Sequence, residues 1–150
     1  MYIKLDDEGN ELSEDAENWS MVRDANTGYV WEVKTSANKH ILYAWEEAFV
    51  FVSQLNERKF GGYNDWRLPA VRELYTLVDV SKYDPAINIV YFPNTQLGGY
   101  WSSTTEDRST GRALYVGFLN GYVYGNGKSY LYYVRAVRGG HRDFIVMRYR

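Results

Sequence analysis

Tyrosines and small polar residues dominate residues 115–133, the part of the chain whose residue types could do chemistry. Six of the chain's fifteen tyrosines lie there, with four glycines, two asparagines and one serine. Tyrosine offers a large amphipathic contact area at the cost of only two torsions, while Gly, Ser and Asn supply adaptable backbone and hydrogen bonds. Lys128 is the one long charged side chain in the segment, the kind that loses most entropy when a partner immobilises it. This segment therefore has the composition of a binding surface.

Catalytic chemistry finds little support elsewhere in the chain. Ser102 and Ser103 stand in a short polar run, but the two histidines, His40 and His141, lie in segments remote from them, and no Gly-x-Ser-x-Gly turn is present. The absence of cysteine excludes disulfides, thiol catalysis and sulfur-ligated metals. We expect no enzyme activity and no cofactor.

A calcium site is the remaining metal option, with Asn64 and Asp65 as candidate ligands. Calcium takes six to eight oxygens, several of them from carboxylates, and the loop 97–105 contains no acidic residue. We therefore predict no metal site and assign Asp65 to capping or turn formation.

Composition and charge limit the classes of partner that the chain can be expected to bind. A chain of 150 residues suits a single domain, and a net charge of −2 favours neither nucleic acid nor an anionic membrane. The N-terminus lacks an apolar run like that of a signal peptide, and no stretch approaches transmembrane length. We expect synthesis in the cytoplasm, no membrane insertion and a protein or cell-surface ligand; a monomer is compatible with the sequence, which leaves the oligomeric state open.

Hydrophobic periodicity predicts the elements that position the tyrosines. Helical spacing of apolar residues indicates a helix over 43–58, and Pro69 opens a second, shorter helix that continues to Val78. Strands are expected at 20–23, 29–34, 100–103, 113–119, 122–124 and 132–138. The fold class is thus α+β, two helices and an antiparallel sheet with long irregular loops. Residues 1–20 form an acidic lead-in, and its residues 6–17, which hold seven acids, are expected to be solvated.

Alternation along the strands predicts which side chains face outward. Successive residues of a strand point to opposite faces of the sheet. We expect Val116, Phe118, Val123 and Val134 to point inward, which leaves most of the tyrosines on one outer face.

Several motifs resemble a known family. They are residues 62–69 (GYNDWRLP), residues 100–104 (YWSST), and the flanking segments 27–32 (TGYVWE) and 133–138 (YVRAVR). The chain is similar over about residues 21–140 to the C-terminal domain of bacterial collagen-like adhesins (an Lcl C-terminal-like family), and the resemblance implies a C-type lectin fold. Where relatives often place cysteines this chain has Val52 and Ala136, so the resemblance implies apolar packing in place of a disulfide.

Within that fold, residues 105–133 resemble the variable region of proteins diversified by retroelements. Those systems mutate adenines, so asparagine codons become a limited set of residue types. The resemblance implies a hypervariable ligand-binding face made of Asp107, Arg108, Thr110, Gly111, Arg112, Tyr115, Gly117, Leu119, Tyr122, Tyr124, Gly125, Asn126, Gly127, Ser129, Tyr130, Leu131 and Tyr132.

Three functions remain open at this point. The first is a hypervariable display protein of the receptor or adhesin type, carried on a virion or a prokaryotic cell surface. The second is a fixed structural or adhesin module with one constant partner. The third is an oxidative enzyme like the formylglycine-generating enzymes, which share the implied fold but need cysteines or a histidine metal set that this chain lacks.

Overall fold

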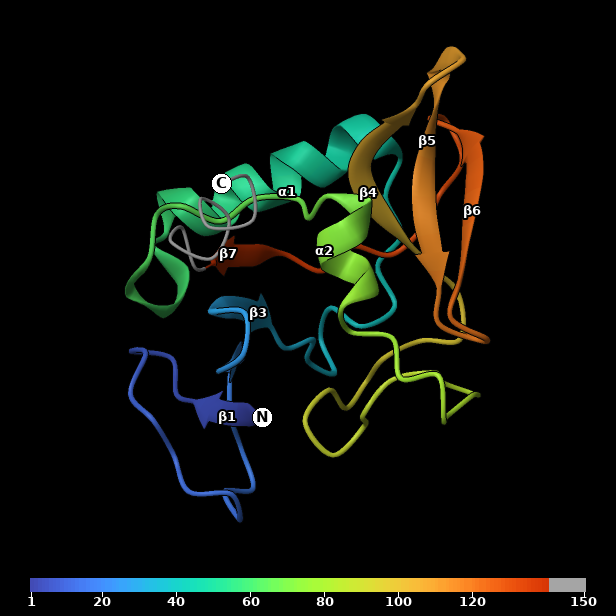
Figure 1. Ribbon diagram of the computed structural model, residues 1–150. Coiled ribbons are helices and arrows are strands. Elements are labelled where there is room, and N and C mark those ends of the chain that lie inside the picture. Colours follow the sequence, from blue (N-terminus) through green and yellow to red (C-terminus); the bar gives the residue numbers. More distant parts are fainter. Residues whose placement is uncertain (141–150) are drawn as a thin grey trace, which may run out of the picture.

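Two antiparallel sheets and two α-helices make up the fold in the computed structural model, which describes residues 1–140 (Figure 1). The α+β class predicted from the sequence is confirmed. The elements in chain order are β1 (Tyr2–Leu5), β2 (Met21–Asp24), β3 (Tyr29–Glu32), α1 (Trp45–Glu57), a 3₁₀ turn η1 (Phe60–Gly62), α2 (Val71–Tyr75), β4 (Gly99–Glu106), β5 (Ser109–Gly117), β6 (Tyr122–Gly127) and β7 (Val137–Gly139).

The helix α1 forms where the apolar spacing predicted it. Its buried side chains, Ala48, Val52 and Leu55, recur at helical spacing and face the core. Glu47 stabilises its start, because the Glu47 carboxylate accepts the Ala44 backbone N–H at 2.7 Å. Val52 and Ala136 are both buried in one apolar cluster, so apolar packing does occupy these two positions.

The second helix, α2, is shorter than predicted. It begins after Ala70, whose N–H donates to the Glu73 carboxylate at 3.0 Å, and it ends at Tyr75. The backbone N–H groups of residues 76–78 each bond to a carbonyl three residues back, so the chain tightens into turns after Tyr75. The predicted continuation to Val78 is therefore wrong.

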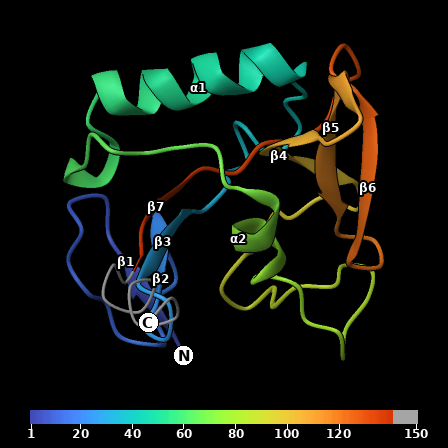
Figure 2. The same cartoon turned by 45° about the horizontal axis from the view of Figure 1, so that its top comes forward.

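The strands form two sheets where one was predicted. The orders are β1-β2-β3-β7 and β4-β5-β6. Residues 132–138 were expected to be one strand, but only Val137–Gly139 is a strand, since Tyr132 bridges Tyr43 and Tyr133 bridges Tyr100 before the chain reaches β3. This segment therefore connects the two sheets, and Figure 2 shows it crossing from β6 to β7.

The lead-in is part of the fold at its beginning. Strand β1 pairs with β2 along its whole length, and Leu5 is fully buried. Lys4 ties the acidic segment to this strand, because its Nζ donates to the carbonyls of Glu14 at 2.7 Å and Ala16 at 2.9 Å. Residues 2–5, at the start of the acidic lead-in, therefore form the edge strand of the four-stranded sheet.

The motif at residues 62–69 packs between the helices and the sheets. The Trp66 ring is buried and its Nε1 donates to the Phe60 carbonyl at 2.9 Å. Arg67 donates to the Gly139 carbonyl at 3.0 Å and forms an ion pair with Glu73 at 2.6 Å. The motif thus links α2 to β7 of the four-stranded sheet.

Candidate functional site

A continuous row of aromatic rings crosses one face of the three-stranded sheet. Strand register places Trp101 opposite Tyr115 and Tyr115 opposite Tyr124, so their side chains share this face. Tyr132 stacks on Tyr115 with ring centroids 4.1 Å apart and meets Trp101 edge-on at 4.8 Å. Tyr115 lies 5.5 Å from Tyr124, which lies 6.3 Å from Tyr122. We call these five residues the aromatic row.

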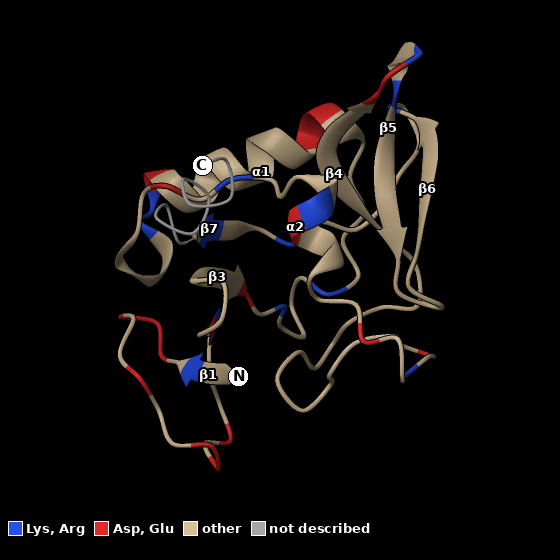
Figure 3. Cartoon of the chain, in the orientation of Figure 1, with Lys and Arg blue, Asp and Glu red and all other residues tan. Residues whose placement is uncertain are grey.

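The aromatic row runs from the core to the solvent. Trp101 is 0 % exposed, Tyr115 and Tyr132 are half-buried, and Tyr124 and Tyr122 are 41 % and 63 % exposed. No lysine, arginine, aspartate or glutamate lies in β6, which is uniformly tan in Figure 3. The exposed end is therefore an amphipathic surface attached to a buried ring.

Amide side chains hold the hydroxyl groups of two of these tyrosines. Asn126 donates to the Tyr132 hydroxyl at 2.8 Å, and Asn120 donates to the Tyr124 hydroxyl at 3.1 Å. Asn120 also accepts the backbone N–H of Tyr122 at 3.1 Å. Asn120 was not among the predicted site residues, although its position in the turn just before β6 could have pointed to it.

Two glycines, Gly99 and Gly117, lie directly against rings of the aromatic row. A Cβ on Gly99 would lie 2.5 Å from the Tyr115 ring and 2.6 Å from the Tyr132 ring, and one on Gly117 would lie 3.2 Å from the Tyr124 ring. Any larger residue at Gly99 would displace two members of the aromatic row. Gly117 was predicted as a site residue and contributes space, whereas Gly99 was not predicted.

Tyr115 keeps its proton over the physiological range. Burial, a hydrogen bond with Tyr132 and the neighbouring phenols Tyr132 and Tyr124 raise the pKa of Tyr115 to about 12. The aromatic row is consequently uncharged at Tyr115, which suits a contact surface and not proton transfer near neutral pH.

The remaining predicted residues do not all join this face. Asp107 and Arg108 occupy the tip of the β4–β5 hairpin, and Leu119 lies in the turn at the opposite end of β5. Arg112 forms an ion pair with Glu106 and donates to the Gly125 carbonyl at 2.8 Å. Its register partner is Gly127, on the face opposite the aromatic row.

The loop after β6 carries the last predicted residues. Ser129, Tyr130 and Leu131 are exposed there, and the Tyr130 ring lies over Gly127. Lys128 secures this loop, because its Nζ donates to the carbonyl of Thr110 at 2.7 Å and its N–H donates to that of Gly111 at 2.9 Å. The same Nζ lies 3.9 Å from the centroid of the Trp45 ring. Lys128, left out of the predicted set, thus positions several of its members.

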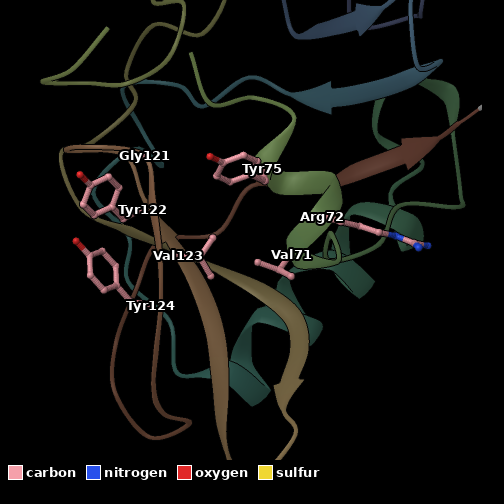
Figure 4. Close-up of a pocket in the computed structure, with 7 residues that line it drawn as sticks. All are labelled: Val71, Arg72, Tyr75, Gly121, Tyr122, Val123 and Tyr124. Carbon is pink, nitrogen blue, oxygen red and sulfur yellow. The ribbon is translucent and has the colours of Figure 1, made fainter. Parts of the chain in front are cut away.

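Val123 is a correction to the predicted inward set. Val116, Phe118 and Val134 are buried as expected, but Val123 is 42 % exposed although it pairs with Val116. The short α2 packs mainly against β4 and β5 and leaves Val123 of β6 partly exposed. An open groove of about 660 Å³ results, with Val71 and Tyr75 of α2 facing Val123 (Figure 4).

Candidate catalytic and metal-binding residues have structural roles. Ser102 is fully buried and its Oγ donates to the Leu114 carbonyl at 2.7 Å. Asp65 does not act as a cap: it accepts two bonds from Arg138, at 2.7 and 3.0 Å, which hold the pKa of Asp65 below its usual range. His40 is exposed, and His141 lies outside the described residues. Over residues 1–140, no group of three or more His, Asp or Glu side chains could hold a metal ion.

Neither α1 nor α2, nor any other helix within the described part of the chain, is long and apolar enough to cross a bilayer.

Comparison with known proteins identifies the family to which the chain belongs. No curated protein matches the chain. A family model described as the Lcl C-terminal domain matches residues 20–138, which include every element from β2 to α2 and the whole three-stranded sheet. This match agrees with the resemblance carried by the motifs at 62–69 and 100–104. The chain belongs to the Lcl C-terminal domain family.

Proposed function

We propose that this protein is a ligand-binding display module of the receptor or adhesin type, without catalytic activity, that binds a protein or cell-surface ligand through the aromatic row. The observation that carries the proposal is the continuity of the row from the buried Trp101 to the exposed Tyr122. The family match favours an adhesin-like module. Display on a virion or a prokaryotic cell surface is part of the proposal.

Pre-organisation is the physical basis of binding. Immobilising a flexible side chain at an interface costs about 0.5–1.5 kcal/mol, and this cost is reduced for rings already held by neighbours. Tyr124 has a ring neighbour on each side and a hydroxyl held by Asn120. Aromatic side chains that a partner buries on binding dominate the binding energy of many protein interfaces.

Binding is tested with the fluorescently labelled chain on a panel of prokaryotic cells, read by flow cytometry. Tyr122→Ser combined with Tyr124→Ser is expected to lower cell binding at least tenfold, since loss of a hot-spot tyrosine costs about 2 kcal/mol or more. Tyr83→Ser is the matched control, because Tyr83 is 77 % exposed and lies in the loop before β4. Equal binding by the double variant and the control would sink the proposal.

Hypervariability of residues 105–133 is the finer part of the proposal. It is tested by sequencing the DNA around the gene. A reverse transcriptase gene and a near-copy of codons 105–133 that differs only at adenines are expected. If both the gene and the near-copy are absent, and residues 105–133 do not vary across isolates, the proposed hypervariability is contradicted.

A fixed adhesin or structural module is the second candidate, and one observation favours it. Tyr115 and Tyr132 are half-buried, stacked on each other and confined by Gly99. These two positions are part of the packing and tolerate few residue types, as expected for a constant surface. An invariant row across isolates that still binds cells supports this candidate.

A further inference from the structure

Two Asn-Gly dipeptides supply the amides that hold the aromatic row. They are Asn120-Gly121 and Asn126-Gly127, and the sequence contains no other pair of this kind. In such a pair the glycine nitrogen attacks the asparagine side chain readily, because glycine has no Cβ to hinder the approach. Asparagine is accordingly among the thermolabile residues of proteins. Each dipeptide is thus a candidate site of deamidation, and the local structure distinguishes the two.

Asn120 is restrained against this attack. Its Oδ1 accepts the backbone N–H of Tyr122 at 3.1 Å, and its Nδ2 donates to the Tyr124 hydroxyl at 3.1 Å. The attacking nitrogen is also engaged, since the Gly121 N–H donates to the Gly117 carbonyl at 2.7 Å. Three hydrogen bonds must therefore break before the Gly121 nitrogen can reach the side-chain carbon of Asn120.

Asn126 already contacts the nitrogen that would attack it. The Gly127 N–H donates to the Asn126 Oδ1 at 2.8 Å. The Lys128 N–H donates to the Gly111 carbonyl of β5, so the Gly127 N–H, one residue earlier on the strand, points away from β5. From outside the dipeptide the amide is held by Tyr132, whose hydroxyl accepts a bond from the Asn126 Nδ2 at 2.8 Å. Once that bond opens, rotation of the amide presents its carbon to the Gly127 nitrogen.

We propose that Asn126 is a site of spontaneous deamidation restrained by the Tyr132 hydroxyl, and that Asn120 stays intact in the folded chain. The Gly127 nitrogen bonds to the side-chain carbon of Asn126, and its proton passes through solvent to Nδ2. The bond from that carbon to Nδ2 breaks, ammonia leaves, and a succinimide remains. Water then opens the ring at either carbonyl, which leaves aspartate or isoaspartate at this position.

The reaction changes the surface around Tyr132. A carboxylate only accepts hydrogen bonds, so the donor to the Tyr132 hydroxyl is lost. Negative charge also enters β6, whose residues 122–127 carry none. Isoaspartate lengthens the main chain beside Lys128, whose bonds to the carbonyls of residues 110 and 111 secure the loop 128–131. The aromatic row is therefore altered at one end as the protein ages.

Ageing of the full chain in mildly alkaline buffer tests the inference, with tandem mass spectrometry of its peptides to follow each asparagine. Asn126 is expected to convert at least about tenfold faster than Asn120. Two fewer hydrogen bonds restrain it from outside the dipeptide, and a tenfold difference in rate corresponds to about 1.4 kcal/mol. In concentrated urea, where neither dipeptide keeps its structure, the two rates are expected to be similar.

Tyr132→Phe tests the restraint directly, because it keeps the ring and removes the hydroxyl. It is expected to speed the conversion of Asn126 about fivefold, the change in rate that one typical hydrogen bond represents. Tyr124→Phe is the matched control, since it removes the hydroxyl that Asn120 holds. This control is expected to leave the rate at Asn126 unchanged.

Two results overturn the inference. One is conversion of Asn120 in the folded chain at a rate equal to or above that of Asn126, including no conversion of either. The other is a rate at Asn126 that Tyr132→Phe does not alter. Both results are read from covalent structure, so they do not depend on whether the aromatic row binds a ligand.

Discussion

The four-stranded and three-stranded sheets place their ion pairs in opposite locations. At the four-stranded sheet an ionic cluster lies inside: Lys34 donates to the Glu32 carboxylate at 2.9 Å, and Arg135 donates to the Glu32 carbonyl at 2.6 Å. At the three-stranded sheet the ion pair of Arg112 and Glu106 lies at the surface. The two sheets thus differ in whether their ion pairs are removed from solvent.

Burial makes the difference between the two ion pairs. Lys34, Glu32 and Arg135 are each less than 5 % exposed, and burial lowers the pKa of Lys34 although Glu32 opposes that shift. An uncompensated charge in such a place is strongly destabilising, whereas a surface pair contributes little. The aromatic row shows a similar contrast between its two ends, because Trp101 is 0 % exposed and Tyr122 is 63 % exposed.

The largest expected effect comes from the buried end of the aromatic row. Trp101→Ala should lower the free energy of unfolding by about 4 kcal/mol, because it leaves a large cavity in the core. Tyr122→Ala should change it by no more than about 0.5 kcal/mol, as is usual for an exposed site. Urea denaturation of both variants measures the difference. Similar losses of unfolding free energy for the two variants would show that the aromatic row is not anchored in the core.

The second-largest loss of stability is expected at the buried ion pair of Glu32 and Lys34. Glu32→Gln is expected to cost about 3 kcal/mol of stability, because two cations stay buried without a carboxylate. Glu106→Gln, the same change in the surface pair with Arg112, is expected to cost less than about 1 kcal/mol. Thermal unfolding at one fixed pH compares the two. An equal cost at both positions would show that burial does not distinguish the two ion pairs.

The close contact of Gly99 with two rings of the aromatic row predicts a smaller loss of stability. Gly99→Ala should destabilise by about 1–3 kcal/mol, because the added methyl overpacks the space filled by Tyr115 and Tyr132. At Gly111 a Cβ would meet no atom within 4 Å, so Gly111→Ala should stay within about 0.5 kcal/mol of the wild type. Near-ultraviolet circular dichroism should also change for Gly99→Ala alone. An unchanged spectrum and stability would place the rings away from Gly99.

The smallest effect is the pH dependence that Tyr115 contributes. Its pKa is raised from 10.0 to about 12 in the folded chain, so the folded state binds the proton more tightly than the unfolded state does. The stabilisation is complete below about pH 10 and is lost as the pH rises toward 12. Tyr115→Phe should therefore reduce the fall in stability over this range, measured by urea denaturation at a series of pH values. An identical fall in both proteins would remove Tyr115 as its source.

Local patterns in the chain were sufficient for several of these features. The spacing of Ala48, Val52 and Leu55 defines α1, because a helix repeats every 3.6 residues and needs no distant partner. Strand alternation correctly placed Val116 and Phe118 inside. The contact surface indicated by the density of tyrosine and glycine after Tyr115 stays a prediction.

Long-range contacts account for the features that no local pattern revealed. Asp65 bonds Arg138 and Glu32 bonds Arg135, although these partners lie 73 and 103 residues apart. The division into two sheets depends on residues 132–138, which bridge different strands at each end. Val123 has the hydrophobic character of a core residue, yet it stays partly exposed because α2 packs mainly against β4 and β5. Side-chain burial is a property of what packs against a residue, and that is decided when distant segments meet.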